Sequence, residues 1–503
     1  MRLTALLLLA GLASGAGAAR VVEPPNGAVF PADLRAPEFV WEDAGGSGPW
    51  TVRFTFAGKA PPLEFVSPGT RWTPARADWE RIKAASLESP AVLEVAGARA
   101  SFTTSKDPVG APIFFRAVPN PFPKVENFAN VKWKLGWVSS YEPAKTVMSG
   151  QRRCFNCHAS SYDGKSFGFE FNPNDDQSDR TAYIRFKNPG RTVLWTWRDY
   201  FDWNSFLPPA QRDRHQATLS AISPDGNIVV TAGASLMTIA FTPCRDMISY
   251  SFPTKGILVY HSEKDKVVRP VPGADDPTFI HIPGSWSPDG RYIYYFGAPV
   301  TAQFESLNRE PPDKAAEEKA RTQDWRVLDK IYPMKYGIYR VPFNEGKGGK
   351  AEAIAGASGN GFSSYFPRAS PDGKWLAFTR SANGALTLRE DSDIYLVPAG
   401  GGKERRLRAN SPQADSWHTW SPNGRWLAFS SKRNGRQTDI MLTHIDDAGR
   451  DSPPVVLTSL RDEDGLSANI PEFFNIGPGR LEKIVPLLPQ WWYAFLRRDE
   501  ALH

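Results

Sequence analysis

The segment WSPNGRWLAF, at residues 420–429, combines a turn signal with an apolar run. Its Asn423-Gly424 pair favours a tight turn with positive φ, and the apolar run that follows has the composition of a strand. The pattern recurs as SPDGNIVV at 223–230, WSPDGRYIYYF at 286–296 and SPDGKWLAF at 370–378, with a weaker copy, SYDGKSFGF, at 161–169. Each copy therefore predicts a β-hairpin.

The intervals between the copies indicate that each hairpin belongs to a larger unit. Further β-like runs follow, such as DIYLV at 393–397 and DIMLT at 439–443. Four-stranded units that repeat every 40–50 residues or so are typical of a β-propeller. Successive turn glycines, from Gly164 to Gly424, are 62, 64, 83 and 51 residues apart, so the connecting loops must be long. The widest gap contains an Ala/Glu/Lys-rich segment, 313–330, which predicts a helical insertion.

Five turn copies imply at least five blades, and we predict six. Residues 132–150 (KWKLGWVSSYEPAKTVMSG) have the pattern of outer strands but no turn copy before them. The stretch 468–476 is available as the inner strand of the same blade. A blade assembled from both ends of the domain would close the ring and remove the free sheet edges.

The rest of the chain divides into three segments around a propeller expected at 106–480. Residues 1–19 carry an early Arg, an apolar core and a small-residue end, the pattern of a secretory signal peptide. Residues 20–105 contain short β-like runs at 39–41, 50–56, 91–95 and 100–103, which favour an immunoglobulin- or fibronectin-like sandwich. The apolar tail at 481–503 predicts a packed helix. The expected fold class is therefore all-β.

Composition narrows the class of protein. Of 503 residues 41% are apolar and 23% are charged, which excludes a wholly disordered chain. The net charge is +6 with no run of Lys or Arg, so nucleic acid is not an expected partner. After the signal peptide no apolar run is long enough for a transmembrane helix. We expect a periplasmic or secreted protein.

One motif carries chemistry: RRCFNCH at 152–158 contains C-x-x-C-H. Two thiols at this spacing can add to the vinyl groups of haem while the adjacent His binds the iron. With 3 Cys and 7 His in the chain, roughly 0.0003 matches are expected by chance. We expect one covalent haem c on Cys154 and Cys157, with His158 as the proximal iron ligand. A Cys154–Cys157 disulfide and a zinc site are the alternatives, but the βαβ context and the further ligands they need are absent.

A second histidine shares the spacing of the first. His158 lies six residues before Gly164, and His418 lies six residues before Gly424. Equal offsets predict equivalent places on two inner strands, so both imidazoles could point into one axial cavity. His418 is therefore the candidate distal ligand. The alternative is that its ring caps a backbone carbonyl.

The other candidate ligands have less support. His215 follows a charged loop and is expected to be exposed, His281 has a different offset, and His444 ends a strand. Met237 or Met247 would give His/Met ligation with a higher potential, and an open position would suit small-ligand or peroxide chemistry. Cys244 is expected to be a buried apolar residue, and the acidic stretch 174–179 a solvated turn rather than a calcium site.

Five stretches resemble bacterial exported proteins that join a propeller to a c-type haem motif. The turn copies themselves are similar to the WD-like repeats of the periplasmic Tol translocation protein. The stretches are PIFFR (112–116), CFNCH (154–158), PGADDP (272–277), SWHTWSPNGR (416–425) and ANIPEF (468–473). The resemblance covers most of the chain and implies a propeller with one c-type haem. It implies no reaction, because propellers host many functions.

Three functions follow from these observations. The leading one is a monohaem c-type cytochrome that transfers electrons to a redox partner protein or docks in a redox assembly. The second is a haem enzyme with an open iron site in the propeller channel. The third is a scaffold that binds envelope proteins or glycans.

Overall fold

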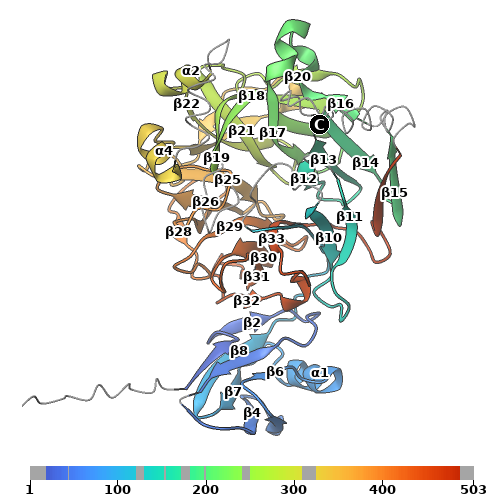
Figure 1. Cartoon of the computed structure of the whole chain (residues 1–503), viewed down its shortest axis with the longest axis vertical. Coiled ribbons are helices and arrows are strands. Elements are labelled where there is room, and N and C mark those ends of the chain that lie inside the picture. The colour runs from blue at the N-terminus through green and yellow to red at the C-terminus, as the bar shows by residue number, and fades with distance from the viewer. Residues whose placement is uncertain are drawn as a thin grey trace, which may run out of the picture. The chain divides into compact units, whose positions relative to one another are not determined.

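The computed structural model describes residues 19–43, 45–120, 130–151, 155–171, 182–196, 200–240, 250–308 and 324–487 (Figure 1). Apart from Ala19, the predicted signal peptide lies outside these ranges. Two compact units are present: one comprises residues 1–30 and 36–106, and the other comprises 31–35 and 107–503. Residues 31–35 group with the second unit because the Asp33 carboxylate accepts hydrogen bonds from the backbone of Val109 and Gly110 at 2.8 and 3.0 Å. Among the described helices, none is long and apolar enough to cross a membrane.

The first unit contains two sheets and one helix. A three-stranded sheet has the order β1-β3-β6, and a five-stranded sheet has the order β2-β8-β7-β4-β5. The elements are β1 (Arg20–Glu23), β2 (Ala28–Phe30), β3 (Phe39–Glu42), β4 (Trp50–Phe56), β5 (Leu63–Ser67), β6 (Arg71–Trp72), α1 (Arg76–Ala85), β7 (Ala91–Val95) and β8 (Ala98–Thr104). All four runs that the sequence predicted are strands.

Aromatic rings from both sheets form the core of this unit. Phe39 of β3 lies 5.4 Å from Phe54 of β4, centroid to centroid, so the sheets pack face to face. Helix α1, which the sequence reading did not anticipate, inserts Trp79 against Phe30 at 5.3 Å. Trp79 is fully buried, and the helix thereby completes the sandwich core.

The second unit is a β-propeller with six four-stranded sheets, as predicted. We number the blades from the first turn copy and name their strands from the inner one outward. Blade 1 is β12 (Phe155–Ser160), β13 (Ser166–Phe171), β14 (Ala182–Lys187), β16 (Tyr200–Asp202); blade 2 is β17 (Gln216–Ile222), β18 (Ile228–Ala240), β19 (Tyr250–Ser262), β20 (Val268–Pro270); blade 3 is β21 (Phe279–Trp286), β22 (Tyr292–Pro299), β23 (Gly337–Pro342), β24 (Glu352–Ala353). Blade 4 is β25 (Ser363–Ala369), β26 (Trp375–Ser381), β27 (Asp393–Pro398), β28 (Arg405–Arg406); blade 5 is β29 (Asp415–Trp420), β30 (Trp426–Ser431), β31 (Asp439–His444), β32 (Val455–Val456); blade 6 is β33 (Ser467–Phe473), β9 (Ile113–Val118), β10 (Lys132–Gly136), β11 (Lys145–Ser149).

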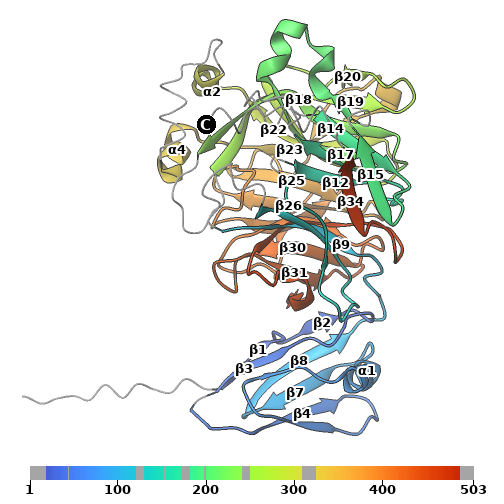
Figure 2. The same ribbon diagram turned by 45° about the vertical axis from the view of Figure 1, so that its right-hand side comes forward.

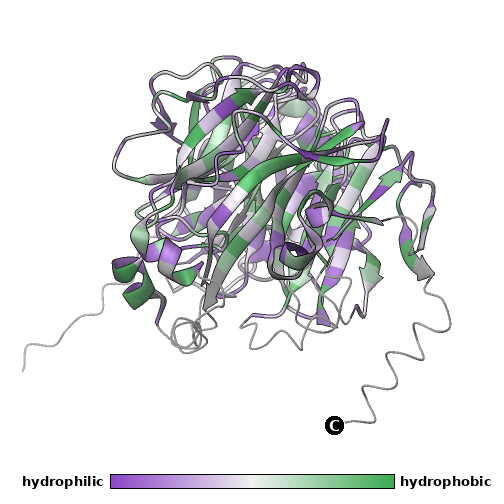
Figure 3. Cartoon of the chain, turned by 90° about the horizontal axis from the view of Figure 1, so that it is seen from above, coloured by the Kyte–Doolittle hydropathy of each residue, from purple (hydrophilic) through white to green (hydrophobic). Residues whose placement is uncertain are grey.

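Each turn copy joins the first and second strands of a blade. All five turn glycines have φ between 67° and 73°, the left-handed conformation that glycine tolerates best. In the blade 3 copy, the Gly290 amide donates to the Ser287 carbonyl at 2.9 Å, and the Ser287 hydroxyl lies 2.6 Å from the Asp289 carboxylate. The turn chemistry therefore sets the register of blades 1 to 5. Coloured by hydropathy, the connecting loops are mostly hydrophilic and the apolar segments lie in the strands (Figure 3).

Blade 6 closes the ring, as predicted, from both ends of the domain. Inner strand β33 pairs with β9, and β10 and β11 complete the sheet. Each inner strand contacts the inner strand of the next blade, and β33 contacts both β29 and β12. Each inner strand of the described ring is therefore flanked by inner strands of both neighbouring blades, which shields the inner edges of the sheets from other chains.

The insertion and the tail depart from the sequence expectation in different ways. Helices α2 (Ala302–Leu307) and α4 (Trp325–Ile331) flank residues 309–323, so the predicted insertion is described only at its end. The prediction of a helix at 481–503 is wrong for its described part, because Lys483–Leu487 is strand β34. It pairs in parallel with β15 (Thr192–Thr196), and Ile484 is buried beside Val193 (Figure 2). Four short 3-10 helices are η2 (Trp203–Phe206), η3 (Pro209–Arg214), η4 (Asn344–Gly346) and η5 (Thr458–Leu460).

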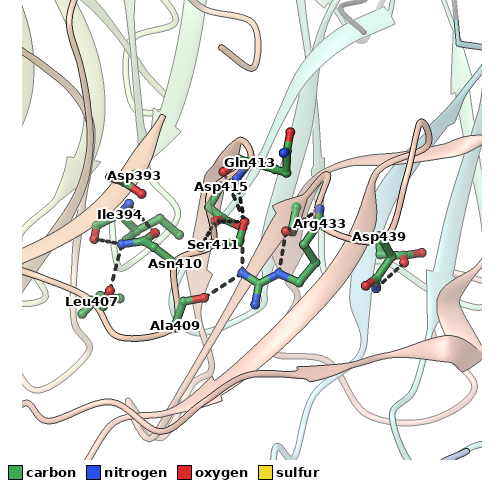
Figure 4. Close-up of polar contacts among 12 residues, drawn as sticks. Asp393, Ile394, Leu407, Ala409, Asn410, Ser411, Gln413, Asp415, Arg433 and Asp439 are labelled. Carbon is green, nitrogen blue, oxygen red and sulfur yellow. Dashed lines mark hydrogen bonds and ion pairs between the residues drawn. The ribbon is translucent and has the colours of Figure 1, made fainter. Parts of the chain in front are cut away.

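An ion pair between Asp415 and Arg433 stabilises blade 5 (Figure 4). The Asp415 carboxylate, which is fully buried, accepts from the Arg433 guanidinium at 2.8 Å and from the Ser411 amide and hydroxyl at 2.6 and 2.8 Å. Arg433 also donates to the Ala409 carbonyl at 2.7 Å and to the Ser431 hydroxyl at 2.8 Å. Both charges are thus satisfied within the fold.

Removing one member of this pair is expected to be costly. Asp415→Ala removes the buried carboxylate partner of Arg433, whose side chain is only 17% exposed, and breaking a largely buried pair of this kind is expected to cost about 3 kcal/mol. Asp393→Ala is the control, because the Arg406 side chain that Asp393 binds is 45% exposed and such pairs contribute about 0–1 kcal/mol. Thermal unfolding of the two variants measures the difference. Equal losses of stability would contradict this account of the pair.

Candidate functional site

The inner strands share an irregularity just ahead of their turns. Their pairing with the second strand shifts register within each of the six blades. In four of them a non-glycine residue has positive φ at this point: Leu219, Phe366, Trp417 and Ile470. His158 of β12 and His418 of β29 lie at this bulge, both six residues before the turn glycine. They therefore occupy equivalent places on their blades.

His158 lies between blades 1 and 6. Its ring meets Phe114 of β9 edge-on, with centroids 4.8 Å apart, and lies 6.3 Å from Phe474 and 6.4 Å from Phe169. The side chain is buried, and neither ring nitrogen makes a hydrogen bond of good geometry, although the nearby Ile470 backbone partly opposes the lowering of its pKa. Burial, together with the positive charges of Arg116 and Arg368, lowers its pKa to about 3. The imidazole is therefore neutral at physiological pH, with a lone pair available.

Cys157 faces the other way. Adjacent residues of a strand project to opposite faces, and the Cys157 side chain forms a hydrogen bond with Glu170. Glu170 accepts a hydrogen bond from the Thr231 hydroxyl of blade 2 at 2.9 Å, and burial raises its pKa to about 8. Cys157 and His158, the described end of the C-x-x-C-H motif, thus lie on opposite faces of the blade 1 sheet. Cys154, the other predicted attachment residue, lies outside the described residues.

His418 and His158 face different neighbouring blades. The His418 ring is buried, neither nitrogen makes a hydrogen bond of good geometry, and burial lowers its pKa to about 3. The carbonyls that oppose this shift belong to Ala377 and Phe366, which places the ring toward blade 4. Since β33 lies between β29 and β12, the two imidazoles occupy different seams between blades. Their equal spacing marks equivalent positions rather than one shared cavity.

The remaining candidates are accounted for individually. His215 is buried, not exposed as expected, because η3 folds back so that the Gln211 carbonyl lies 2.7 Å from its Nδ1. His281 is buried against Phe279 and Tyr295, and the His444 Nε2 lies 3.4 Å from an Asp107 oxygen. Met237 is half-buried on β18. Cys244, Met247 and the acidic stretch 174–179 lie outside the described residues. Within the described ranges, no group of three or more His, Cys, Asp or Glu is arranged to hold a metal ion.

Protonation of His418 should destabilise the fold in acid. Its folded pKa, about 3, lies below the ordinary value of 6.5, so below pH 6.5 the unfolded chain binds a proton that the folded chain refuses. Stability is therefore lost as pH falls from 6.5 towards 3, by about 2 kcal/mol per such group at pH 5. His418→Gln is expected to reduce the loss between pH 7 and pH 5 by about that amount.

Denaturant unfolding at the two pH values measures this effect. Wild type and variant should both carry Cys154→Ala and Cys157→Ala, so that no haem intervenes. An unchanged pH dependence in the His418 variant would show that the ring is not buried in its neutral form.

Sequence reasoning missed a pocket on the propeller axis. Every inner strand contributes to its wall, next to the turns: Ala159, Ser160, Ala221, Ile222, Ser285, Trp286, Arg368, Ala369, Thr419, Trp420, Glu472 and Phe473. In blades 1 to 5 these residues lie four and five positions before the turn glycine. The histidines at the sixth position are not among them. Counting five residues back from the turn glycine, instead of the six that identified the histidines, would have identified Arg368.

The chain has distant similarity to a few known proteins. No family model matches the chain. An uncharacterized protein of Agrobacterium fabrum is 25% identical over 181 residues, which is 34% of this chain and 56% of the relative. The chain thus spans about half the length of this curated relative.

Among solved structures, TolB from Acinetobacter baumannii has a TM-score of 0.43 and 14% identity over 72% of this chain and 66% of its own. A putative TolB from Agrobacterium tumefaciens has a TM-score of 0.32 and 13% identity, covering 75% of this chain and 96% of its own. Oligogalacturonate lyase from Vibrio parahaemolyticus has a TM-score of 0.38 and 13% identity, covering 65% of this chain and 74% of its own. This chain is therefore similar to these proteins at the level of the β-propeller fold alone.

Proposed function

We propose that this protein is a monohaem c-type cytochrome built on a β-propeller, with the haem bound covalently to Cys154 and Cys157 and its iron bound by His158. The observation that carries the proposal is the C-x-x-C-H motif, whose histidine is buried without a hydrogen bond of good geometry at either nitrogen. A buried nitrogen without a partner costs about 1–3 kcal/mol, and a metal ion would relieve that cost. Two thiols that can add to the haem vinyl groups, beside a neutral imidazole that can bind the iron, suit a c-type haem.

The surrounding residues supply the environment such a group needs. Phe114, Phe169 and Phe474 exclude water from the His158 ring. The charges of Arg116 and Arg368 help to keep the imidazole in the neutral form that can bind iron. When bound, haem would supply one-electron exchange with a redox partner protein. The protein's own part is to hold the ligand and shield it.

Covalent attachment of haem would require a conformational change in blade 1. Because β12 directs Cys157 and His158 to opposite faces, a haem held by both requires the start of this strand to leave its extended conformation. The bulge between Phe155 and His158 interrupts the pairing with β13 at that point. This irregular stretch is where a change of conformation would cost the fewest ladder hydrogen bonds.

A second candidate, a haem enzyme, is favoured by one observation. His418, the candidate distal ligand, lies in another seam, so the described structure offers no partner opposite His158. An open iron position would then suit a small ligand or peroxide rather than electron transfer alone.

The test is to express the full chain, signal peptide included, in a host that matures c-type cytochromes. We expect a mass increase of one haem that survives denaturation, and the spectrum of a reduced c-type cytochrome. Carbon monoxide binding to the reduced protein would favour the enzyme, and its absence the carrier. A protein that acquires no covalent haem would overturn both redox functions and leave the propeller as a scaffold.

A further inference from the structure

Among the described residues, the pocket on the propeller axis is lined by two charged side chains. They are Arg368 of β25 and Glu472 of β33, on non-adjacent blades, and the cavity has a volume of about 70 Å³. A cavity of that size has room for a few water molecules or one small organic anion. Residues from six strands converge here, so the site depends on ring closure and is rigidly held.

The Arg368 guanidinium has donors to spare. Its Nη2 lies 3.3 Å from Glu472 Oε2, and among the described residues it makes no hydrogen bond of good geometry. Its side chain is 26% exposed, compared with 9% for Glu472, so the guanidinium is the more accessible of the two. Its charge also contributes to the lowered pKa of His158 and His418. A planar donor fork in a shielded pocket is suited to a bidentate carboxylate or phosphate.

We propose that the axial pocket binds a small organic monocarboxylate through the guanidinium of Arg368. Hydroxyls of Ser160, Ser285 and Thr419 supply further polar groups on the wall, and Trp286 and Phe473 supply apolar surface for the rest of the molecule. Burial raises the pKa of Glu472 although Arg368 opposes the shift, so one negative charge can be accommodated beside it. A doubly charged phosphate would meet stronger repulsion from that carboxylate, so we assign the carboxylate class.

Tyr162 fixes the far wall of the pocket. It replaces the proline that the other turn copies carry between Ser and Asp or Asn. Its hydroxyl reaches across from blade 1 to the carbonyls of Ala369 in blade 4 and Trp286 in blade 3, at 3.1 and 3.3 Å. The phenol proton is therefore engaged, and Tyr162 bounds the cavity rather than binding the ligand.

The test titrates acetate, acetamide and inorganic phosphate against the folded protein by ligand-observed NMR. Acetate should bind more tightly than its neutral isostere acetamide and more tightly than phosphate. Arg368→Gln should weaken acetate binding by at least about tenfold, because a charged hydrogen-bonded pair is lost. Glu472→Gln should strengthen it by about three- to tenfold, and should favour phosphate most.

The two variants are expected to change the affinity for acetate in opposite directions. A misfolded Glu472→Gln protein cannot bind acetate more tightly, so misfolding cannot produce the expected gain. The Cys154→Ala/Cys157→Ala protein should bind acetate as the wild type does, because the site is independent of the haem motif. Equal binding of acetate and acetamide, or no gain in Glu472→Gln, would overturn the proposal. Loss of acetate binding in the double-cysteine variant would do so as well, by placing the anion site at the haem motif.

Discussion

Deletion of residues 467–503 is expected to abolish the folded propeller. Strand β33 is the inner strand of blade 6 and contacts the inner strands of blades 5 and 1, so its removal opens the ring on both sides. Six of its seven residues are buried, Ile470 being the exception. Without it, the edge of β9 is exposed along a fully buried apolar strand, an arrangement prone to association between chains.

A shorter deletion provides the control. Removing residues 477–503 keeps β33 and Phe474 but removes β34, so it should retain a cooperative melting transition with reduced stability. Circular dichroism melts and gel filtration distinguish the two. A truncation at 466 that still melts cooperatively as a monomer would show that five blades are enough, and would refute the role assigned to β33.

The five turn copies made most of the propeller predictable because their physics is local. Gly290 adopts a positive φ and Ser287 holds the turn whatever lies elsewhere in the chain. Blade 6 followed from the need to close the ring. Its second strand, IFFRAV at 113–118, was not predicted as a strand, because a continuous apolar run without a turn signal does not distinguish a buried strand from a helix.

Non-local pairing accounts for the tail. Residues 483–487 have an apolar composition that also suits a helix, and only the edge of β15, almost 300 residues away in sequence, makes them a strand. Helix α1 was missed for the opposite reason: it lies between short strands, and only burial of Trp79 and Ile82 reveals its inward face.

The site shows where spacing stops being informative. Equal offsets correctly placed His158 and His418 at one register of two inner strands. Offsets do not specify the direction of a side chain, and the bulge turns this position into the seams between blades. Position five before the glycine, where Arg368 lies, lines the axial pocket instead. The bulge is a property of the paired strands, so one strand's sequence does not reveal it.

Substituting the haem motif is expected to give the largest change in the properties of the protein. Cys154→Ala with Cys157→Ala should remove all covalent haem from protein matured in the same host, because both thioether bonds are lost. His158→Ala should change the absorption spectrum and spin state of whatever haem remains attached, because it removes the one imidazole in the motif. The mass of the denatured protein and its reduced spectrum measure these effects.

His418→Ala is the matched control for His158→Ala. The two rings share register, burial, a pKa near 3 and nitrogens without a hydrogen bond of good geometry, yet they lie in different seams. If ligation requires the motif, only the His158 variant changes the spectrum. If instead both variants convert a low-spin iron to high-spin, the two histidines approach one iron, and blades 5, 6 and 1 must rearrange when the haem is attached. A change in the His418 variant alone would remove His158 from its proposed role.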